Sequence, residues 1–152
     1  MKRISEVGAL LKKIYRRYSS DLITSLQSKG FIDLRPSFLE ILSYVSETDS
    51  PSIKEIGHAC GLKKQTMTSH LNELEKRGYI KRTTGLRDKR EQIVVFTDYG
   101  EKFKIALLDA IDDLETLYLK SLGDVELDRI VRTLNNFHFK INEIDKKQKS
   151  LI

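Results

Sequence analysis

Residues 53–97 read IKEIGHACGLKKQTMTSHLNELEKRGYIKRTTGLRDKREQIVVFT, and they carry most of the information about the fold. The basic residues of this stretch are concentrated between positions 76 and 90, where seven Lys and Arg stand against one acid, Asp88. The local charge is +6 in a chain whose total is +5, so all other residues together sum to about −1. A focused positive patch favours binding to a polyanion, because each phosphate neutralised by Lys or Arg releases condensed counterions.

A pair of helices is predicted just before this basic run. Ser52 stands three residues before Glu55, as in a capping box, and predicts the start of a short helix. Gly61 supplies a turn, and a second helix is predicted over residues 63–77, with Gly78 as its stop. The apolar residues of this second helix share one face: Met67, Leu71 and Leu74. Short polar residues project from the opposite face: Gln65, Thr68, Ser69 and Asn72.

Two strands follow, over residues 79–84 and 92–97, and residues 85–91 form a polar, mostly basic hairpin tip between them. This order of elements is typical of a winged helix-turn-helix: a helix, a glycine turn, a second helix and a cationic hairpin. In such a protein the second helix enters the major groove of DNA, where Gln and Asn side chains can read base edges. The hairpin reaches a neighbouring minor groove or the backbone with arginine.

Helices are also predicted on both sides of this region. An amphipathic helix runs from Ser5 to about Ser28 and ends at Gly30. Pro36 suits the first turn of the next helix, in which Ser37 and Glu40 are spaced as a second capping box.

Two further helices are predicted after the hairpin. Thr97 is the expected N-cap of the first, and Gly123-Asp124 separates it from the second, which extends to about residue 147. The predicted fold class is therefore mainly α with a small β wing. The long terminal helices carry apolar stripes that a lone protomer would leave exposed, which predicts a dimer whose dissociation and unfolding are coupled.

Composition limits the class of protein. Apolar residues make up 39% of the chain and charged residues 32%, which is typical of a globular protein. The single cysteine, Cys60, cannot form an intrachain disulfide and fits a reducing cytoplasm. No stretch approaches the roughly 20 apolar residues of a membrane span, and the basic N-terminus lacks a signal-peptide core. We therefore expect a cytoplasmic protein without a membrane partner.

Several segments of the chain, taken together, resemble one family. They are residues 56–62 (IGHACGL), residues 74–80 (LEKRGYI), Asp88-Lys89-Arg90, and residues 94–97 (VVFT) followed by Gly100. In this order and at this spacing they are similar to the multiple-antibiotic-resistance regulator (MarR) family. The resemblance covers nearly the whole chain, since the flanking long helices also fall where that family has them.

The resemblance implies a bacterial, homodimeric, DNA-binding transcription regulator, most simply a repressor, that grips a palindromic operator. Residues 1–152 would form a single MarR-like domain. Within it, residues 34–100 would be the winged helix-turn-helix, and residues 5–30 and 101–147 the dimerisation helices. Family members commonly release DNA when a small phenolic or lipophilic effector binds between the dimerisation and DNA-binding parts.

Site residues are carried over by position. Seven would lie in or beside the major groove: Lys63, Lys64, Gln65, Thr66, Thr68, Ser69 and Asn72. Four belong to the wing: Arg87, Asp88, Lys89 and Arg90, of which Arg90 would enter the minor groove with Asp88 bracing it. Three positions depart from the family's usual pattern, namely Gly57, Ser69 and His70, and Ser69 removes a favoured guanine-reading arginine.

Other interpretations stay open at this level. The basic run and the polar stripe are also compatible with an ordinary solvated surface. Cys60 fits a small buried hydrophobe better than a redox sensor, and peroxide-sensing family members carry their cysteine in the first helix, where this chain has none. Five aromatic residues suit either an effector pocket or the core: Tyr15, Tyr18, Phe31, Phe38 and Tyr44.

Enzymatic interpretations find little support, because neither a phosphate-binding glycine loop nor a nucleophile motif is present. The three histidines are too scattered for a zinc site, so neither a metal nor a cofactor is predicted. A winged-helix module for protein assembly remains the alternative to a DNA-binding regulator. The regulator interpretation requires Arg87 and Arg90 to lie on the same side of the molecule as Gln65 and Thr68.

Overall fold

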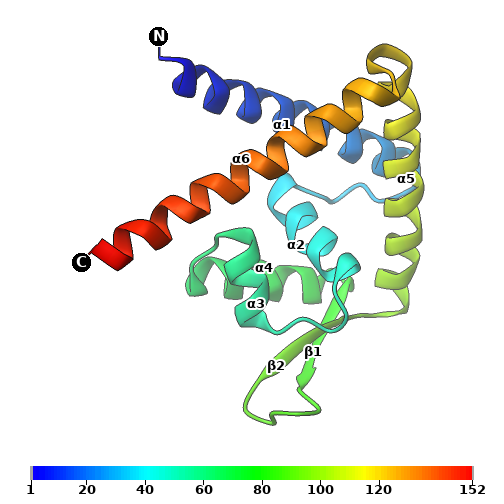
Figure 1. The fold of residues 1–152 in the computed structure, drawn as a ribbon. Coiled ribbons are helices and arrows are strands. Elements are labelled where there is room, and N and C mark those ends of the chain that lie inside the picture. Colours follow the sequence, from blue (N-terminus) through cyan, green and yellow to red (C-terminus); the bar gives the residue numbers. More distant parts are fainter. Residues whose placement is uncertain (1, 152) are drawn as a thin grey trace. The chain divides into compact units, whose positions relative to one another are not determined.

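The structure is a computed structural model that describes residues 2–151, with the side chains of residues 2–148. Figure 1 shows the elements in chain order, as predicted: a mainly helical protein with one two-stranded antiparallel sheet. They are α1 (Arg3–Ser28), α2 (Pro36–Glu47), α3 (Ile53–Cys60), α4 (Lys64–Lys76), β1 (Ile80–Thr84), β2 (Gln92–Phe96), α5 (Asp98–Leu122) and α6 (Asp124–Leu151). The fold class inferred from the sequence is thereby confirmed.

The chain divides into two compact units after Ile111. The first unit holds α1 to α4, the two strands and the N-terminal part of α5, and the second holds the rest of α5 and α6. All residues of the predicted DNA-binding site belong to the first unit.

The centre of the first unit is α2, which contacts α1, α3, α4 and β2. Its apolar residues are almost completely buried, and they meet the apolar faces of the neighbouring helices because each helix repeats its apolar positions at intervals of three and four. The buried side chains are Leu22 and Leu26 of α1; Phe38, Leu39, Ile41, Leu42 and Val45 of α2; Ile56 of α3; and Met67, Leu71 and Leu74 of α4. The predicted inward face of α4 is confirmed.

Two glycines close the ends of the helix pair. Gly61 has φ of 64° and Gly78 has φ of 87°, in the left-handed region that side chains other than glycine rarely adopt. Beyond Gly61, the Leu62 N–H donates to the Gly57 carbonyl at 2.9 Å, and beyond Gly78 the Tyr79 N–H donates to the Leu74 carbonyl at 3.1 Å. These bonds satisfy helix carbonyls that would otherwise lack partners and turn the chain sharply out of each helix.

Of the two caps predicted from capping-box spacing, one forms and the other does not. The Ser52 hydroxyl accepts from the Glu55 N–H at 3.0 Å at the start of α3. The capping box predicted for Ser37 and Glu40 is wrong, since the N-cap of α2 is Arg35, which makes no side-chain cap bond. Pro36 occupies the first helical position, so Ser37 already lies inside the helix, beyond the position from which a hydroxyl can cap it.

The hairpin pairs β1 with β2 in antiparallel register, with Ile80 opposite Phe96 and Arg82 opposite Val94. Each strand is one residue shorter than predicted. The Tyr79 N–H closes the end of α4, and the Thr97 hydroxyl accepts from the Gly100 N–H at 3.0 Å, where it caps α5.

A backbone connection that the sequence did not predict joins the hairpin to α3. Ser52 forms a β-bridge with Ile93, and the Val94 N–H donates to the Pro51 carbonyl at 2.9 Å. The residue that caps α3 therefore also fixes the base of the wing against the helix pair.

Aromatic side chains fix the start of α5 within the same unit. Phe103 packs edge-on against Phe31 and Tyr79, with ring centroids 5.5 and 5.4 Å away, and Tyr79 lies 5.0 Å from Tyr99. Phe31 is thus a core residue. Of the two interpretations left open for it, a pocket residue or a core residue, the structure supports the second.

Candidate nucleic-acid interface

The predicted reading helix α4 presents a polar stripe to solvent. Gln65, Thr68, Ser69 and Asn72 are all exposed, while Met67, Leu71 and Leu74 on the opposite face are buried. Lys64 and Thr66 are exposed in the first turn, and Lys63 is the N-cap residue. The Thr68 hydroxyl donates to the Lys64 carbonyl at 2.9 Å, so its oxygen remains available mainly as an acceptor.

The wing tip is exposed from Leu86 to Glu91, a stretch that includes Arg87, Asp88, Lys89 and Arg90. The Asp88 carboxylate accepts from the Arg90 backbone N–H at 3.0 Å and lies 3.8 Å from its guanidinium Nε. The Arg90 side chain is nevertheless 96% exposed. Asp88 therefore contacts Arg90 through its backbone and side chain and leaves the guanidinium exposed.

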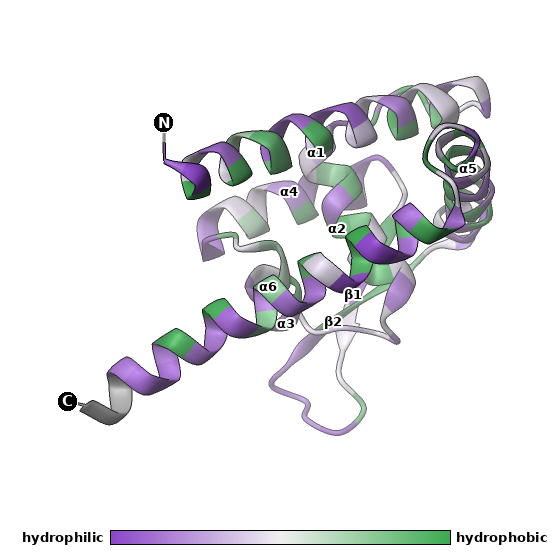
Figure 2. Ribbon diagram, turned by 45° about the horizontal axis from the view of Figure 1, so that its top comes forward, coloured by the Kyte–Doolittle hydropathy of each residue, from purple (hydrophilic) through white to green (hydrophobic). Residues whose placement is uncertain are grey.

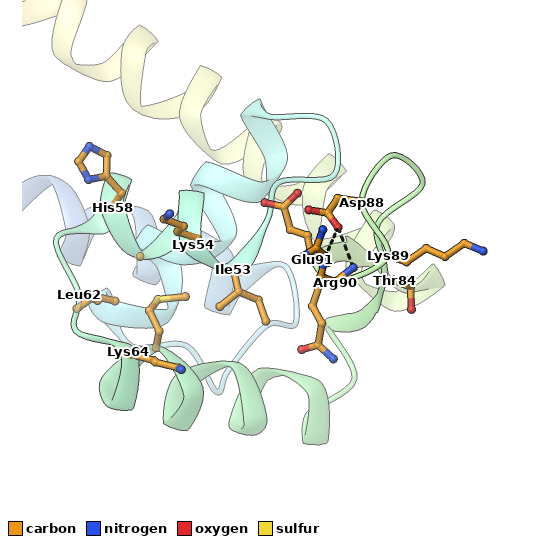
Figure 3. A pocket seen from close by; sticks show the side chains of 13 residues that line it. Ile53, Lys54, His58, Leu62, Lys64, Thr84, Asp88, Lys89, Arg90 and Glu91 are labelled. Carbon is orange, nitrogen blue, oxygen red and sulfur yellow. Dashed lines mark hydrogen bonds and ion pairs between the residues drawn. The ribbon is translucent and has the colours of Figure 1, made fainter.

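A hollow of about 900 Å³ lies between the helix pair and the wing. Figure 3 shows its lining: Ile53, Leu62 and Lys64 come from the helix pair, and Thr84, Asp88 and Arg90 come from the hairpin. Lys89 also belongs to the lining, and its side chain extends away from α4. The start of α4 and the wing arginine thus share one concave surface. Gln65, Thr68 and Arg87 do not line this hollow.

The two carboxylates of α4 are paired within the protein. Glu73 accepts from the Arg77 Nε at 3.0 Å, and Glu75 accepts from the Arg82 Nη2 at 2.5 Å. The hydrogen bonds from Arg82 hold the pKa of the Glu75 carboxyl below its ordinary value. Both acids are therefore neutralised by arginines, which lessens their repulsion of a polyanion near the polar stripe.

The C-terminal end of α4 is anchored to the loop that joins α1 and α2. The Arg77 Nη1 donates to the Asp33 carbonyl, and the Tyr79 hydroxyl donates to the Asp33 carboxylate at 2.6 Å. Burial raises the pKa of the Tyr79 hydroxyl, and the bond to Asp33 adds to this effect. The Arg77 guanidinium also lies 5.0 Å from the centre of the Phe38 ring. These contacts fix the direction in which α4 projects.

Sequence reasoning missed two residues of this surface. Lys54 lies in the first turn of α3 and lines the hollow with Lys64 and Arg90. Arg82 bonds both Glu75 and Asn72, and Asn72 was predicted only as a base reader. A signal for Arg82 was present, because it stands two residues after buried Ile80 and so shares its side of the strand.

A second, smaller hollow of about 230 Å³ lies among α1, α2 and α3. Tyr15, Tyr18 and Tyr44 line it together with Glu40, Glu47 and Cys60. Phe38 does not line it, because its ring is buried against His70, with centroids 5.4 Å apart. Burial, followed by the nearby Glu40 carboxylate, raises the pKa of the Cys60 thiol to about 11. Cys60 is therefore a protonated thiol at neutral pH, which favours its interpretation as a packing residue.

A helix-turn-helix followed by a two-stranded wing, with lysine and arginine on the surface that they share, defines a winged-helix DNA-binding protein. The MarR family model matches residues 34–92, the same segment that builds this surface. This match supports a MarR family transcription regulator whose residues 34–92 form the DNA-binding winged helix.

One curated relative is similar in sequence, and two solved structures are similar in fold. The regulator SarZ from Staphylococcus saprophyticus is 29% identical over 137 residues, which cover 86% of each chain. A MarR family regulator from Rhodococcus sp. RHA1 shares the fold with a TM-score of 0.72 at 19% identity, over 92% of this chain and 97% of that one. The PcaV regulator from Streptomyces coelicolor, solved with its natural ligand, has a TM-score of 0.67 at 14% identity, over 91% and 95% of the two chains.

Within residues 2–151, no helix has the length and apolar content needed to cross a bilayer.

Proposed function

We propose that this regulator is a cytoplasmic homodimer that binds a palindromic operator in double-stranded DNA and represses the adjacent genes. In this proposal α4 enters the major groove, and the wing holds the neighbouring minor groove or backbone. The reading set consists of Lys63, Lys64, Gln65, Thr66, Thr68, Ser69 and Asn72, and the wing set of Arg87, Asp88, Lys89 and Arg90. The domain boundaries stay as predicted from the sequence.

The observation that carries the proposal is the hollow shared by α4 and the wing. Its cationic lining residues come from three elements: Lys54 from α3, Lys64 from α4, and Lys89 and Arg90 from the hairpin. A duplex that places a groove over α4 would bring a sugar–phosphate strand close to this lining. Lysine and arginine there supply donors and release counterions from that strand.

The dimer is supported by apolar side chains that each unit leaves exposed. On α1 these include Ile4, Leu10 and Ile14, and on α6 they include Val131, Leu134, Phe139, Ile141 and Ile144. Figure 2 shows hydrophobic positions recurring along α1 and along α6. A second copy would remove such side chains from water. Twofold symmetry would then place the two α4 helices about 34 Å apart, on an inverted repeat.

The hollow lined by Tyr15, Tyr18 and Tyr44 supports release by a small phenolic or lipophilic effector. Burial raises the pKa of the Tyr18 hydroxyl, with smaller contributions from Glu47 and Tyr15, so this hydroxyl stays a neutral donor. Aromatic walls with a few polar groups suit a small aromatic ligand. That PcaV was solved with a natural ligand agrees with this part of the proposal.

The decisive experiment selects bound DNA from a random pool at two salt concentrations and then measures affinity by fluorescence anisotropy. Arg90→Ala should weaken binding to all sequences and reduce the slope of log affinity against log salt by about 1, because one phosphate contact is lost. Lys12→Ala is the matched control, since it removes one positive charge from α1, outside the hollow, and should leave the slope unchanged.

Two results would contradict the proposal. If Arg90→Ala and Lys12→Ala behave alike, the wing does not engage DNA. If the wild-type protein shows no salt-dependent affinity for any DNA, the winged-helix surface serves protein assembly instead.

A further inference from the structure

Arg82 connects the base of the wing to the reading face of α4. It lies opposite Val94 in the hairpin and two residues after Ile80, both of which are buried, so its side chain leaves the sheet on the side that faces α4. There its Nη2 donates to the Glu75 carboxylate at 2.5 Å and to the Asn72 Oδ1 at 2.7 Å. The Arg82 Nε and backbone N–H also donate to Glu75, at 3.1 and 3.4 Å.

These bonds fix the orientation of the Asn72 amide. A guanidinium is only a donor, so the Asn72 atom that faces it must be the carbonyl oxygen. The amide nitrogen then lies on the other side of the group and offers its two N–H donors to the solvent. Asn72 is exposed on the same helix face as Gln65 and Thr68, so these donors belong to the surface proposed to enter the major groove.

This orientation affects which base Asn72 can recognise. Asparagine normally reads adenine with both amide atoms: the oxygen accepts from N6, and the nitrogen donates to N7. In this protein the oxygen already accepts a charge-assisted bond from Arg82, so an adenine N6 donor would have to share or displace that bond. Guanine presents two hydrogen-bond acceptors in the major groove, O6 and N7, so a side chain needs only donors to bind it there.

We propose that Arg82 is a specificity-determining positioning residue, which holds Asn72 as a donor so that it favours guanine over adenine at one position of each half-site. This inference rests on the proposed function, because it assumes that α4 lies in the major groove. Arg82 itself contacts no base in this arrangement. Its charge is neutralised by Glu75, so it adds little to the salt dependence of DNA binding.

The test uses selection from a random DNA pool, followed by anisotropy at several salt concentrations, on full-length variants. Asn72→Ala identifies the base position that Asn72 reads. Arg82→Met removes the guanidinium but keeps an unbranched apolar side chain of similar reach. Lys81→Met is the matched control, since it removes one positive charge from the adjacent residue, which points to the other side of the same strand.

We expect guanine at the identified position in the wild-type site. Arg82→Met should shift the preference there towards adenine by about tenfold, because the freed amide can then make the bidentate adenine contact. It should leave the slope against salt unchanged. Arg82→Lys keeps a donor and should retain part of the guanine preference, whereas Lys81→Met should change affinity and not the preferred base.

Several outcomes would overturn the inference. One is adenine at the Asn72 position in the wild-type site. Another is an unchanged base preference in Arg82→Met together with a reduced salt slope, which would make Arg82 a phosphate contact. If Arg82→Met is poorly folded, Glu75→Gln provides a second test. It removes the charge that holds the Arg82 guanidinium and should weaken the guanine preference.

The inference and the proposed function fail in distinguishable ways. No enrichment of any sequence by the wild-type protein would contradict the proposed function. A palindromic site whose base preference is the same in wild type, Arg82→Met and Glu75→Gln would contradict only the role of Arg82.

Discussion

Three arginines near the wing divide into two groups: Arg77 and Arg82 are held by carboxylates of the protein, and Arg90 extends into solvent. Arg77 is held by Glu73 and Asp33 with 28% of its side chain exposed, and Arg82 is held by Glu75 with 23% exposed. Arg90 is 96% exposed. Two of the seven basic residues between positions 76 and 90 therefore hold the surface in shape, and the outward-facing charge is smaller than the residue count indicates.

Gly100 is the position where a single methyl group should disturb the protein most clearly. A Cβ there would lie 2.0 Å from the Tyr79 carbonyl oxygen and 2.7 Å from the Phe96 Cδ1. Gly100→Ala should lower the free energy of unfolding by about 3 kcal/mol, because the overpacking falls on backbone that cannot move aside. Chemical denaturation at a fixed protein concentration measures this change.

Gly8→Ala is the control for Gly100→Ala. Gly8 lies inside α1, and a Cβ there would meet no atom within 4 Å. Alanine at this position should stabilise the helix by about 0.5–1 kcal/mol. Equal effects of the two substitutions would show that the close approach of α5 to Tyr79 is not rigid.

At the scale of elements, the start of α3 connects two parts of the DNA-binding surface. Ser52 caps α3 with its hydroxyl, and its backbone forms the bridge to Ile93 of β2. The helix pair and the wing are therefore joined at one residue as well as through Arg82. Since the cap orients α3, it also helps to define the hollow that Lys54 and Lys64 line.

The two caps predicted from capping-box spacing, at Ser52 and Ser37, provide a paired test. Ser52→Ala should cost about 1 kcal/mol of stability, because the Glu55 N–H loses its acceptor. Ser37→Ala should be close to neutral, since Ser37 lies within α2 and does not cap it. Thermal unfolding of both variants against wild type measures the difference, and a larger loss for Ser37→Ala would contradict the assignment of the helix starts.

At the scale of the whole molecule, the proposed dimer would bury the exposed apolar residues of α1 and α6 and would link stability to assembly. If a second copy covers them, dissociation and unfolding are coupled, and the unfolding midpoint rises with protein concentration. Sedimentation and denaturation over a hundredfold range of concentration measure both effects. A folded monomer that is stable at micromolar concentration would contradict the dimer.

A charge placed in the apolar stripe of α6 tests the same interface. Ile141 is 43% exposed in the single chain, and Ile141→Glu should shift the equilibrium towards monomer and weaken binding to a palindrome more than to a half-site. Asn142→Glu introduces the same charge without removing an apolar side chain. It should have a much smaller effect on assembly.

Three features could be predicted from the sequence alone: the order of elements, the buried face of α4 and the cationic hairpin. These features depend on local chemistry: helical spacing of apolar residues, glycine at left-handed positions, and charge concentrated in one hairpin. The single wrong cap followed from a local competition, because Pro36 took the first helical position and moved Ser37 inside the helix.

The partners of the polar side chains depend on how the elements pack, and the sequence did not predict them. Asp33 lies far from Arg77 and Tyr79 in the chain, and Arg82 reaches Asn72 only because the hairpin folds back against α4. The pattern of charges could not distinguish an arginine that holds a helix from one that extends into solvent. That distinction depends on contacts between elements, and the positions of those elements are set by packing of the whole core around α2.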